Sequence, residues 1–149
     1  MREWTRDDVA ARLEAAARVM RAQPRVGPRG AFNAWPTYFH AFADKVGQEP
    51  EMRRPQPSPR AVSEAEEAMG WLRWLEPDDA RLVWMRAQGA AWKAICWRSG
   101  LTRSTAHRRW QYALSVIVWK LSGRRVPTKR SKQSIVDRTP ASRVARARQ

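Results

Sequence analysis

The sequence predicts an all-α protein: a small helical bundle with a C-terminal helix-turn-helix and a disordered basic tail. Apolar residues recur at steps of three and four in several separate stretches, which is typical of helices with one buried face. No stretch of useful length alternates apolar and polar residues as a half-buried strand does, and no internal repeat is present. Proline and glycine clusters separate the stretches, so we expect several short helices.

The N-terminal part predicts a pair of helices. Thr5 is a suitable N-cap, with acidic residues in the first turn, for a helix that runs to about Ala22. A second helix is expected from Pro36 to Val46, with its proline in the first turn. We assign residues 4–48 to this N-terminal helical pair. The apolar positions of the first helix are Val9, Leu13, Ala16, Ala17 and Met20.

A proline-rich linker is expected next. Residues 49–59 contain four prolines, and a chain with that spacing cannot hold a helix. Ser58 followed by Pro59 then predicts an N-cap and first turn of a third helix, which runs to about Leu75. A fourth helix is expected over residues 77–88.

The most specific pattern lies between Trp92 and Trp110. A short helix ends at Gly100, where a left-handed turn is expected, and Thr102 caps the next helix. This is the outline of a helix-turn-helix, within a DNA-binding domain assigned to residues 60–122. The apolar face of the second helix is expected at Ala106, Trp110, Ala113, Leu114, Ile117 and Leu121. The facing core positions are expected at Ala94, Ile95 and Leu101.

Positive charge is concentrated in the second half of the chain. The formal net charge is +15, and residues 78–149 hold 17 Lys and Arg against three Asp and Glu. Such an excess favours a polyanionic partner, either nucleic acid or an anionic membrane face. Residues 123–149 lack aromatic side chains, and this composition predicts a disordered basic tail. A weaker alternative is a short helix around residues 142–148 that forms on nucleic acid.

Candidate site residues lie on the open face of the helix after Gly100. We assign base reading in the major groove to Arg103, Ser104, His107 and Arg108, because these side chains can donate or accept hydrogen bonds at base edges. Phosphate contacts are assigned to Lys93, Arg98, Thr102, Arg109, Gln111, Arg124 and Arg125. Three alternatives stay open: an ordinary helical hairpin, His107 as a simple exposed side chain, and a tail that serves localisation or solubility.

The spacing resembles the C-terminal DNA-binding region of bacterial sigma factors and of related response-regulator domains. Those families place core aliphatic residues six and ten positions after the turn glycine, where this chain has Ala106 and Trp110. Carried over by position, the resemblance implies the same four base-reading residues. The chain departs from the pattern at Cys96, which is often alanine, and at Ser99, usually a large aliphatic. We expect Trp97 or Trp110 to fill the gap at Ser99.

The layout over residues 4–121 also resembles a family of helix-turn-helix proteins of bacteriophages and prophages. The matching pieces are Trp4-Thr5, Ala34-Trp35-Pro36, the run from Gly70 to Leu75, and the run from Trp92 to Ile95. This resemblance implies a phage or prophage setting and no particular activity.

Catalytic and metal chemistry find little support. The two histidines, His40 and His107, have no carboxylate or cysteine neighbour at metal-ligand spacing, and phosphate-loop and nucleophile-elbow motifs are absent. The single Cys96 excludes an internal disulfide. We therefore expect that the protein has no enzymatic activity and binds no cofactor. The charged N-terminus and the lack of a long apolar run indicate a cytoplasmic, nucleoid-associated protein without a membrane partner.

The sequence is compatible with two functions. The first is a sequence-selective double-stranded DNA-binding regulator of phage or prophage type, with RNA polymerase as a possible partner. The alternative is the small subunit of a phage DNA-packaging terminase, in which residues 4–75 would form a homo-oligomer interface and a packaging ATPase would be the partner. An RNA-binding function rests only on the basic tail.

Overall fold

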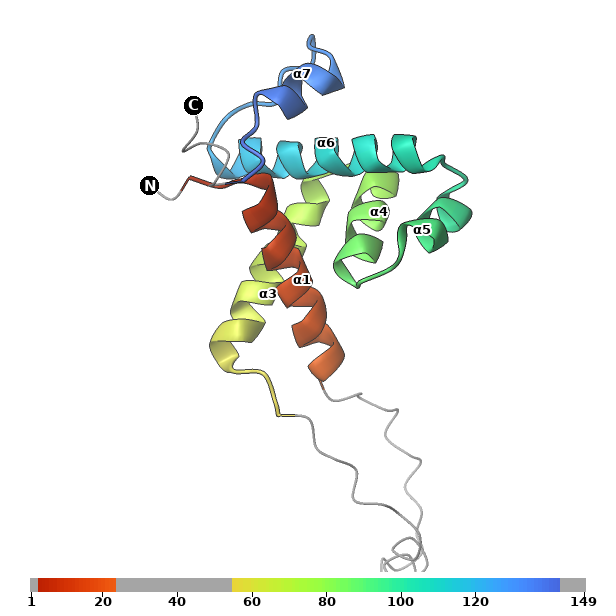
Figure 1. Ribbon diagram of the computed structural model, residues 1–149. Helices are drawn as coiled ribbons and strands as arrows, with labels where there is room; N and C mark the ends of the chain where they lie inside the picture. The colour runs from red at the N-terminus through yellow and green to blue at the C-terminus, as the bar shows by residue number, and fades with distance from the viewer. Residues whose placement is uncertain (1–2, 24–54, 143–149) are drawn as a thin grey trace, which may run out of the picture.

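The computed structural model describes residues 3–23 and 55–142, and these residues form helices and connecting turns without any strand (Figure 1). The predicted all-α class is confirmed. The expected helix at 36–46, residues 49–54 of the expected linker, and most of the weaker helix at 142–148 lie outside the described residues. The elements are α1 (Arg6–Ala22), α3 (Pro59–Trp71), the 3-10 turn η1 (Leu72–Trp74), α4 (Pro77–Ala87), α5 (Trp92–Ser99), α6 (Arg103–Leu121) and α7 (Lys132–Asp137).

Helix α1 begins as its sequence predicts. The Thr5 hydroxyl accepts a hydrogen bond from the Asp8 N–H at 3.2 Å, and the Asp8 carboxylate accepts one from the Thr5 N–H at 3.1 Å. This reciprocal pair is a capping box, which satisfies two donors that the first helical turn leaves free. The expected apolar face is buried at Val9, Leu13, Ala16 and Ala17, whereas Met20 is 41% exposed near the open end of the helix.

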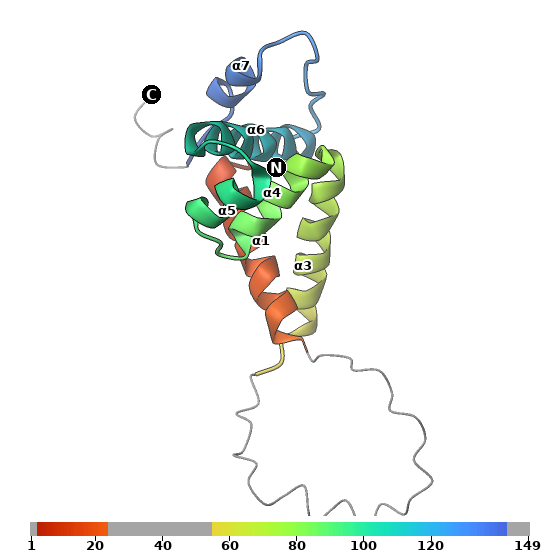
Figure 2. The same cartoon turned by 90° about the vertical axis from the view of Figure 1, so that its right-hand side faces the viewer.

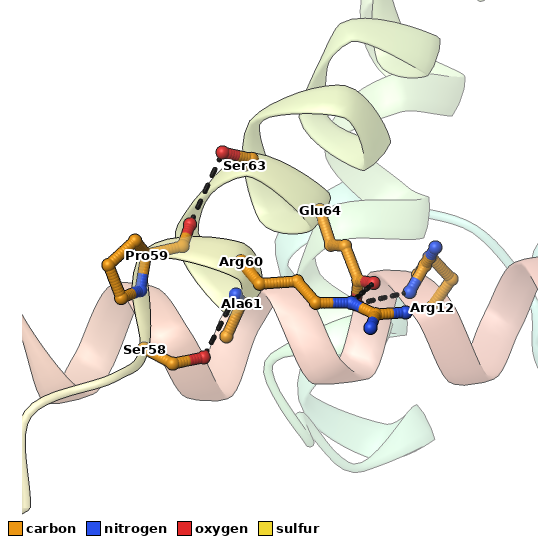
Figure 3. Close-up of polar contacts among 7 residues, drawn as sticks. All are labelled: Arg12, Ser58, Pro59, Arg60, Ala61, Ser63 and Glu64. Atoms are coloured by element: carbon orange, nitrogen blue, oxygen red, sulfur yellow. Dashed lines mark hydrogen bonds and ion pairs between the residues drawn. The ribbon is translucent and has the colours of Figure 1, made fainter.

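Helix α3 is capped by Ser58 and tied to α1 by a shared carboxylate (Figure 3). The Ser58 hydroxyl accepts from the Ala61 N–H at 3.2 Å. Glu64 accepts hydrogen bonds from Arg60 at 3.0 Å and from Arg12 of α1 at 2.6 Å. The hydrogen bond from Arg60, followed by the nearby positive charge of Arg12, lowers the pKa of Glu64. Because the folded pKa is lowered, this contact stabilises the fold at neutral pH and is lost as acid protonates Glu64.

One core joins α1, α3, α4 and α6. Trp71 is 3% exposed, and Trp4 packs edge-on against it with ring centroids 5.3 Å apart. The sequence left open whether residues 1–48 pack against the DNA-binding domain; in the structure, α1 buries its apolar face in the same core as the later helices. The core residues are Val9, Leu13, Ala16, Ala17, Ala65, Ala68, Trp71, Val83, Ala87, Ala113, Leu114, Ile117 and Val118.

Helix α6 is enclosed from two sides over its second half. The bundle of α1, α3 and α4 lies on one side of α6, and α7 lies on the opposite side (Figures 1 and 2). As a result, six consecutive residues, 113–118, are buried, although one face of a helix accounts for only about half of them. The first half of α6 has no such cover, and this difference defines where the helix is open to a partner.

The prediction of a disordered tail is wrong for residues 123–142. Ser131 caps α7, where Ile135 is 1% exposed and Val136 is 7% exposed. The Trp119 indole N–H donates to the Thr139 hydroxyl at 2.9 Å. Composition suggested too little apolar surface for order, but two aliphatic side chains suffice here because α6 supplies the other side of the contact.

The chain after α7 also fastens the start of α1. The backbone N–H groups of Arg6 and Asp7 each donate at 3.1 Å, to the carbonyl oxygens of Pro140 and Ala141. These bonds use donors of the first helical turn that have no partner within α1. The segment that follows α7, up to Ala141, is therefore part of the fold.

None of the helices in the described ranges is long and apolar enough to cross a membrane.

Two glycine substitutions are expected to change stability in opposite directions. Gly100 has φ +67°, so Gly100→Ala should lower the free energy of unfolding by about 1 kcal/mol. Gly70 lies within α3, and an added Cβ would meet only the end of the Arg73 side chain at 3.9 Å. Gly70→Ala should therefore raise the free energy of unfolding by roughly 0.5–1 kcal/mol. Urea denaturation of both variants measures this; a gain from Gly100→Ala would contradict the left-handed turn.

Candidate nucleic-acid interface

Helices α5 and α6 meet through a tight turn. Gly100 ends α5 in the left-handed conformation, with φ 67° and ψ 16°. Thr102 then caps α6, because its hydroxyl accepts from the Thr105 N–H at 3.3 Å. The predicted glycine and the predicted cap are both confirmed, and together they fix the direction in which α6 leaves α5.

A small second core holds α5 against α4 and α6. Leu82, Ile95 and Ala106 are its buried members, and Leu101 and Trp110 pack against them. Ile95 and Leu101 thus lie where the sequence placed them. Ala94 was also expected in this core, but it is exposed, because a helix of eight residues turns only one narrow face towards its neighbours.

The expected gap at Ser99 is absent. Ser99 is exposed and its hydroxyl donates to the Ile95 carbonyl at 2.8 Å, so no large side chain is needed there. Trp97 is 85% exposed, and the expectation that it fills a gap at Ser99 is wrong. The end of α5 is turned towards solvent, while Trp110 packs in the core beneath it.

An aromatic group supports the open face of α6. The His107 ring lies 5.4 Å from the Trp92 ring and 5.7 Å from the Trp110 ring, between centroids. Trp92 and Trp110 are edge-on at 5.8 Å, and the Arg86 guanidinium lies 5.2 Å from the Trp92 centroid. Trp92 is therefore a packing residue, and it restricts the directions in which the exposed His107 side chain can point.

The four residues assigned to base reading share the open half of α6. Arg103, Ser104, His107 and Arg108 are all exposed. Within the described part of the chain, neither Arg103 nor Arg108 has a carboxylate at ion-pair distance. Two unpaired guanidinium groups on one helix face, beside a hydroxyl and an imidazole, form a surface suited to hydrogen-bond acceptors on a polyanion.

The residues assigned to phosphate contacts are more scattered. Lys93 and Arg98 are exposed on α5, and Gln111 is half-buried on α6. The Thr102 hydroxyl is used for the cap of α6. Arg124 and Arg125 are exposed beyond the C-terminal end of α6. At 1.5 Å per helical residue they lie about 30 Å from Arg103.

Arg109 has a structural partner. Its Nε donates to the Asp79 carboxylate at 2.6 Å, and the Asp79 side chain is only 5% exposed. This ion pair joins the first turn of α4 to α6. The assigned phosphate contact of Arg109 would have to use its remaining guanidinium N–H groups.

The sequence did not predict a role for Lys132, because the tail was expected to be disordered. The connector after α6 returns along that helix, and Lys132 Nζ lies 5.1 Å from the Tyr112 ring centroid. Burial raises the pKa of Tyr112, and the negative charges of Asp79 and Glu76 raise it further. The usable signal in the sequence was Ser131 as an N-cap followed by the apolar pair of α7.

The residues that the structure describes provide no cluster of metal ligands. They contain no group of three or more His, Cys, Asp or Glu side chains that could hold a metal ion.

The fold and the surface define an all-helical protein with one open, basic helix face. The chain belongs to the family described as Domain of unknown function (DUF6362), whose model matches residues 21–117. The match spans α3 to most of α6, and it leaves α7 outside. No curated protein and no solved structure matches the chain.

Proposed function

We propose that the protein binds double-stranded DNA with sequence selectivity, and that α5, the Gly100 turn and α6 act as a helix-turn-helix. The observation that carries the proposal is the open half of α6, where Arg103, Ser104, His107 and Arg108 are exposed together while the opposite face is held in two cores. In such motifs the second helix enters the major groove and its first residues contact base edges.

The dimensions of α6 agree with this use. A helix with its side chains is about 10–12 Å across, which matches a major groove about 12 Å wide, and the open part of α6, residues 103–112, is about 15 Å long at 1.5 Å per residue. Lys93 and Arg98 are exposed on α5, the helix that in such motifs crosses the phosphate backbone. The net charge of +15 supports a polyanionic partner.

The biological role that we propose is transcriptional regulation of phage or prophage type, with RNA polymerase as a candidate partner. The packaging alternative needs an oligomer interface on residues 4–75. In the described part of that range, the apolar faces of α1 and α3 are used within the chain's own core, and the large exposed hydrophobic side chains are Met20 and Trp74. This use of α1 and α3 within the chain's own core supports the regulatory role.

The experiment is selection of bound duplexes from a random DNA pool with the full chain, followed by fluorescence anisotropy on the selected duplex and a scrambled duplex. We expect a selected site that binds at least tenfold more tightly than the scrambled duplex, and an affinity that falls steeply with salt. Equal affinity for both duplexes would contradict sequence selectivity. A preference for double-stranded RNA over both would contradict the DNA target.

The basic residues after α6 need charge substitutions rather than truncation. Removing residues 123–149 would take α7 away and expose the apolar residues that it covers on α6. Replacing Arg124 and Arg125 with glutamine leaves α7 in place. If both contact phosphates, the slope of log affinity against log salt should fall by about two; an unchanged slope would remove them from the interface.

A further inference from the structure

Helix α7 sets a limit to the open face of α6. It covers the outer side of α6 where Ser115 and Val116 are buried, so α6 can enter a groove only up to about Tyr112. If the first three turns of α6 lie in the major groove of a duplex, the edge of that groove therefore lies beside the start of α7. That edge is formed by backbone phosphates.

A groove between α6 and α7 lies at this position. It has a volume of about 250 Å³, and its lining includes Thr105, Arg108 and Tyr112 from α6 with Lys132 and Gln133 from α7. Among the residues that the structure describes, no carboxylate lines it. The acidic residue nearest in sequence, Asp137, accepts a hydrogen bond from the Gln133 amide at 2.9 Å.

The donors of this groove are available. Lys132 is exposed and, among the residues that the structure describes, has no carboxylate at ion-pair distance. The Thr105 hydroxyl oxygen accepts from the Thr102 hydroxyl at 2.9 Å, so its own proton is free to donate. An ammonium and a hydroxyl that line the same groove are suited to a phosphate group.

We propose that the α6–α7 groove seats one backbone phosphate of the bound duplex, held by Lys132 and Thr105, and that α7 thereby fixes how α6 is placed in the major groove. This rests on the proposed function. Phosphate contacts position a protein on DNA but do not distinguish one sequence from another. This contact should therefore contribute equally to the affinity for every DNA sequence. Arg108, which we assign to base reading, also lines the α6–α7 groove, so the phosphate contact would hold it in a fixed position relative to the DNA.

The test compares Lys132→Gln with Lys120→Gln, which removes the same charge from an exposed lysine near the other end of α6. Affinities for a selected and a scrambled duplex are measured over a range of salt. We expect Lys132→Gln to lower the salt slope by about 0.9 and to weaken both duplexes by the same factor. Lys132→Arg should restore the slope, and Lys120→Gln should leave it unchanged.

Each other outcome is decisive. If the unaltered protein binds no duplex, the proposed function fails and the seat fails with it. If the protein binds but Lys132→Gln keeps the original slope, the seat alone is overturned. Loss of affinity for the selected duplex only would make Lys132 a base contact and would also overturn the proposal. Thermal melting of Lys132→Gln, monitored by circular dichroism, checks that α7 stays folded.

Discussion

Replacing Arg108 with alanine is expected to reduce affinity for a selected duplex by roughly tenfold to a hundredfold while leaving affinity for a scrambled duplex within about fivefold. Arg103→Ala should behave in the same way. A bidentate contact from a guanidinium to a guanine contributes about 1–3 kcal/mol of discrimination, and only the correct base offers both acceptors. Both side chains are exposed and unpaired within the described residues, so their removal does not disturb the core.

The matched control is Arg81→Ala. Arg81 is an exposed arginine on α4, and its contact with Asp78 is a long one at 3.9 Å between side chains that are each 74% exposed. This variant removes the same charge away from the open face of α6. We expect no change in the ratio of the two affinities. Equal losses on both duplexes for Arg103→Ala and Arg108→Ala would assign these residues to phosphate contacts instead.

Local signals in the sequence were reliable because their physics is local. A hydroxyl at Thr5, Ser58 or Thr102 caps the helix that starts one residue later, whatever the rest of the chain does. In the same way, Gly100 has the positive φ that ends a helix before a tight turn. These positions predicted the starts of α1, α3 and α6 and the end of α5.

The contacts between distant segments were not visible in the same way. Spacing along α6 predicts one apolar stripe, but Val116 lies off that stripe and is buried nonetheless, since α7 covers a second side. This off-stripe valine was the available sign of another packing element. Nothing in local spacing could predict that Asp79 and Arg109 form an ion pair, because 30 residues separate them.

The candidate site contains residues that local spacing predicts and residues that depend on packing between helices. The open face of α6 followed from helix periodicity and the cap, so its four exposed residues could be assigned from the sequence. The role of Arg109 and the return of Lys132 depend on how α4 and α7 pack against α6. The position of a basic residue on a helix thus predicts exposure better than it predicts whether the charge is free.

Removing the Asp79 carboxylate is expected to cause the largest loss of stability from a polar substitution. Asp79→Ala should lower the free energy of unfolding by about 3 kcal/mol, because the partly buried Arg109 guanidinium would lose its partner. The side chain of Arg109 is 31% exposed, so water can replace part of the lost interaction and the cost should fall at the low end for buried pairs. Urea denaturation gives the value.

Asp78→Ala is the control, because it removes a neighbouring carboxylate from the same first turn of α4. Its contact with Arg81 is exposed, so a loss below about 1 kcal/mol is expected. Equal losses from the two variants would mean that Asp79 acts only through the helix dipole. The double variant Asp79→Leu with Arg109→Met should recover most of the stability, since it leaves no charge unpaired.

The double variant also decides what else Arg109 does. It removes the guanidinium without leaving a buried carboxylate, so α6 should stay in place and DNA affinity can be measured on an intact fold. If Arg109 serves only to join α4 to α6, the salt slope of the double variant should equal that of the unaltered protein. A slope lower by about 0.9 would show that its remaining N–H groups also contact a phosphate.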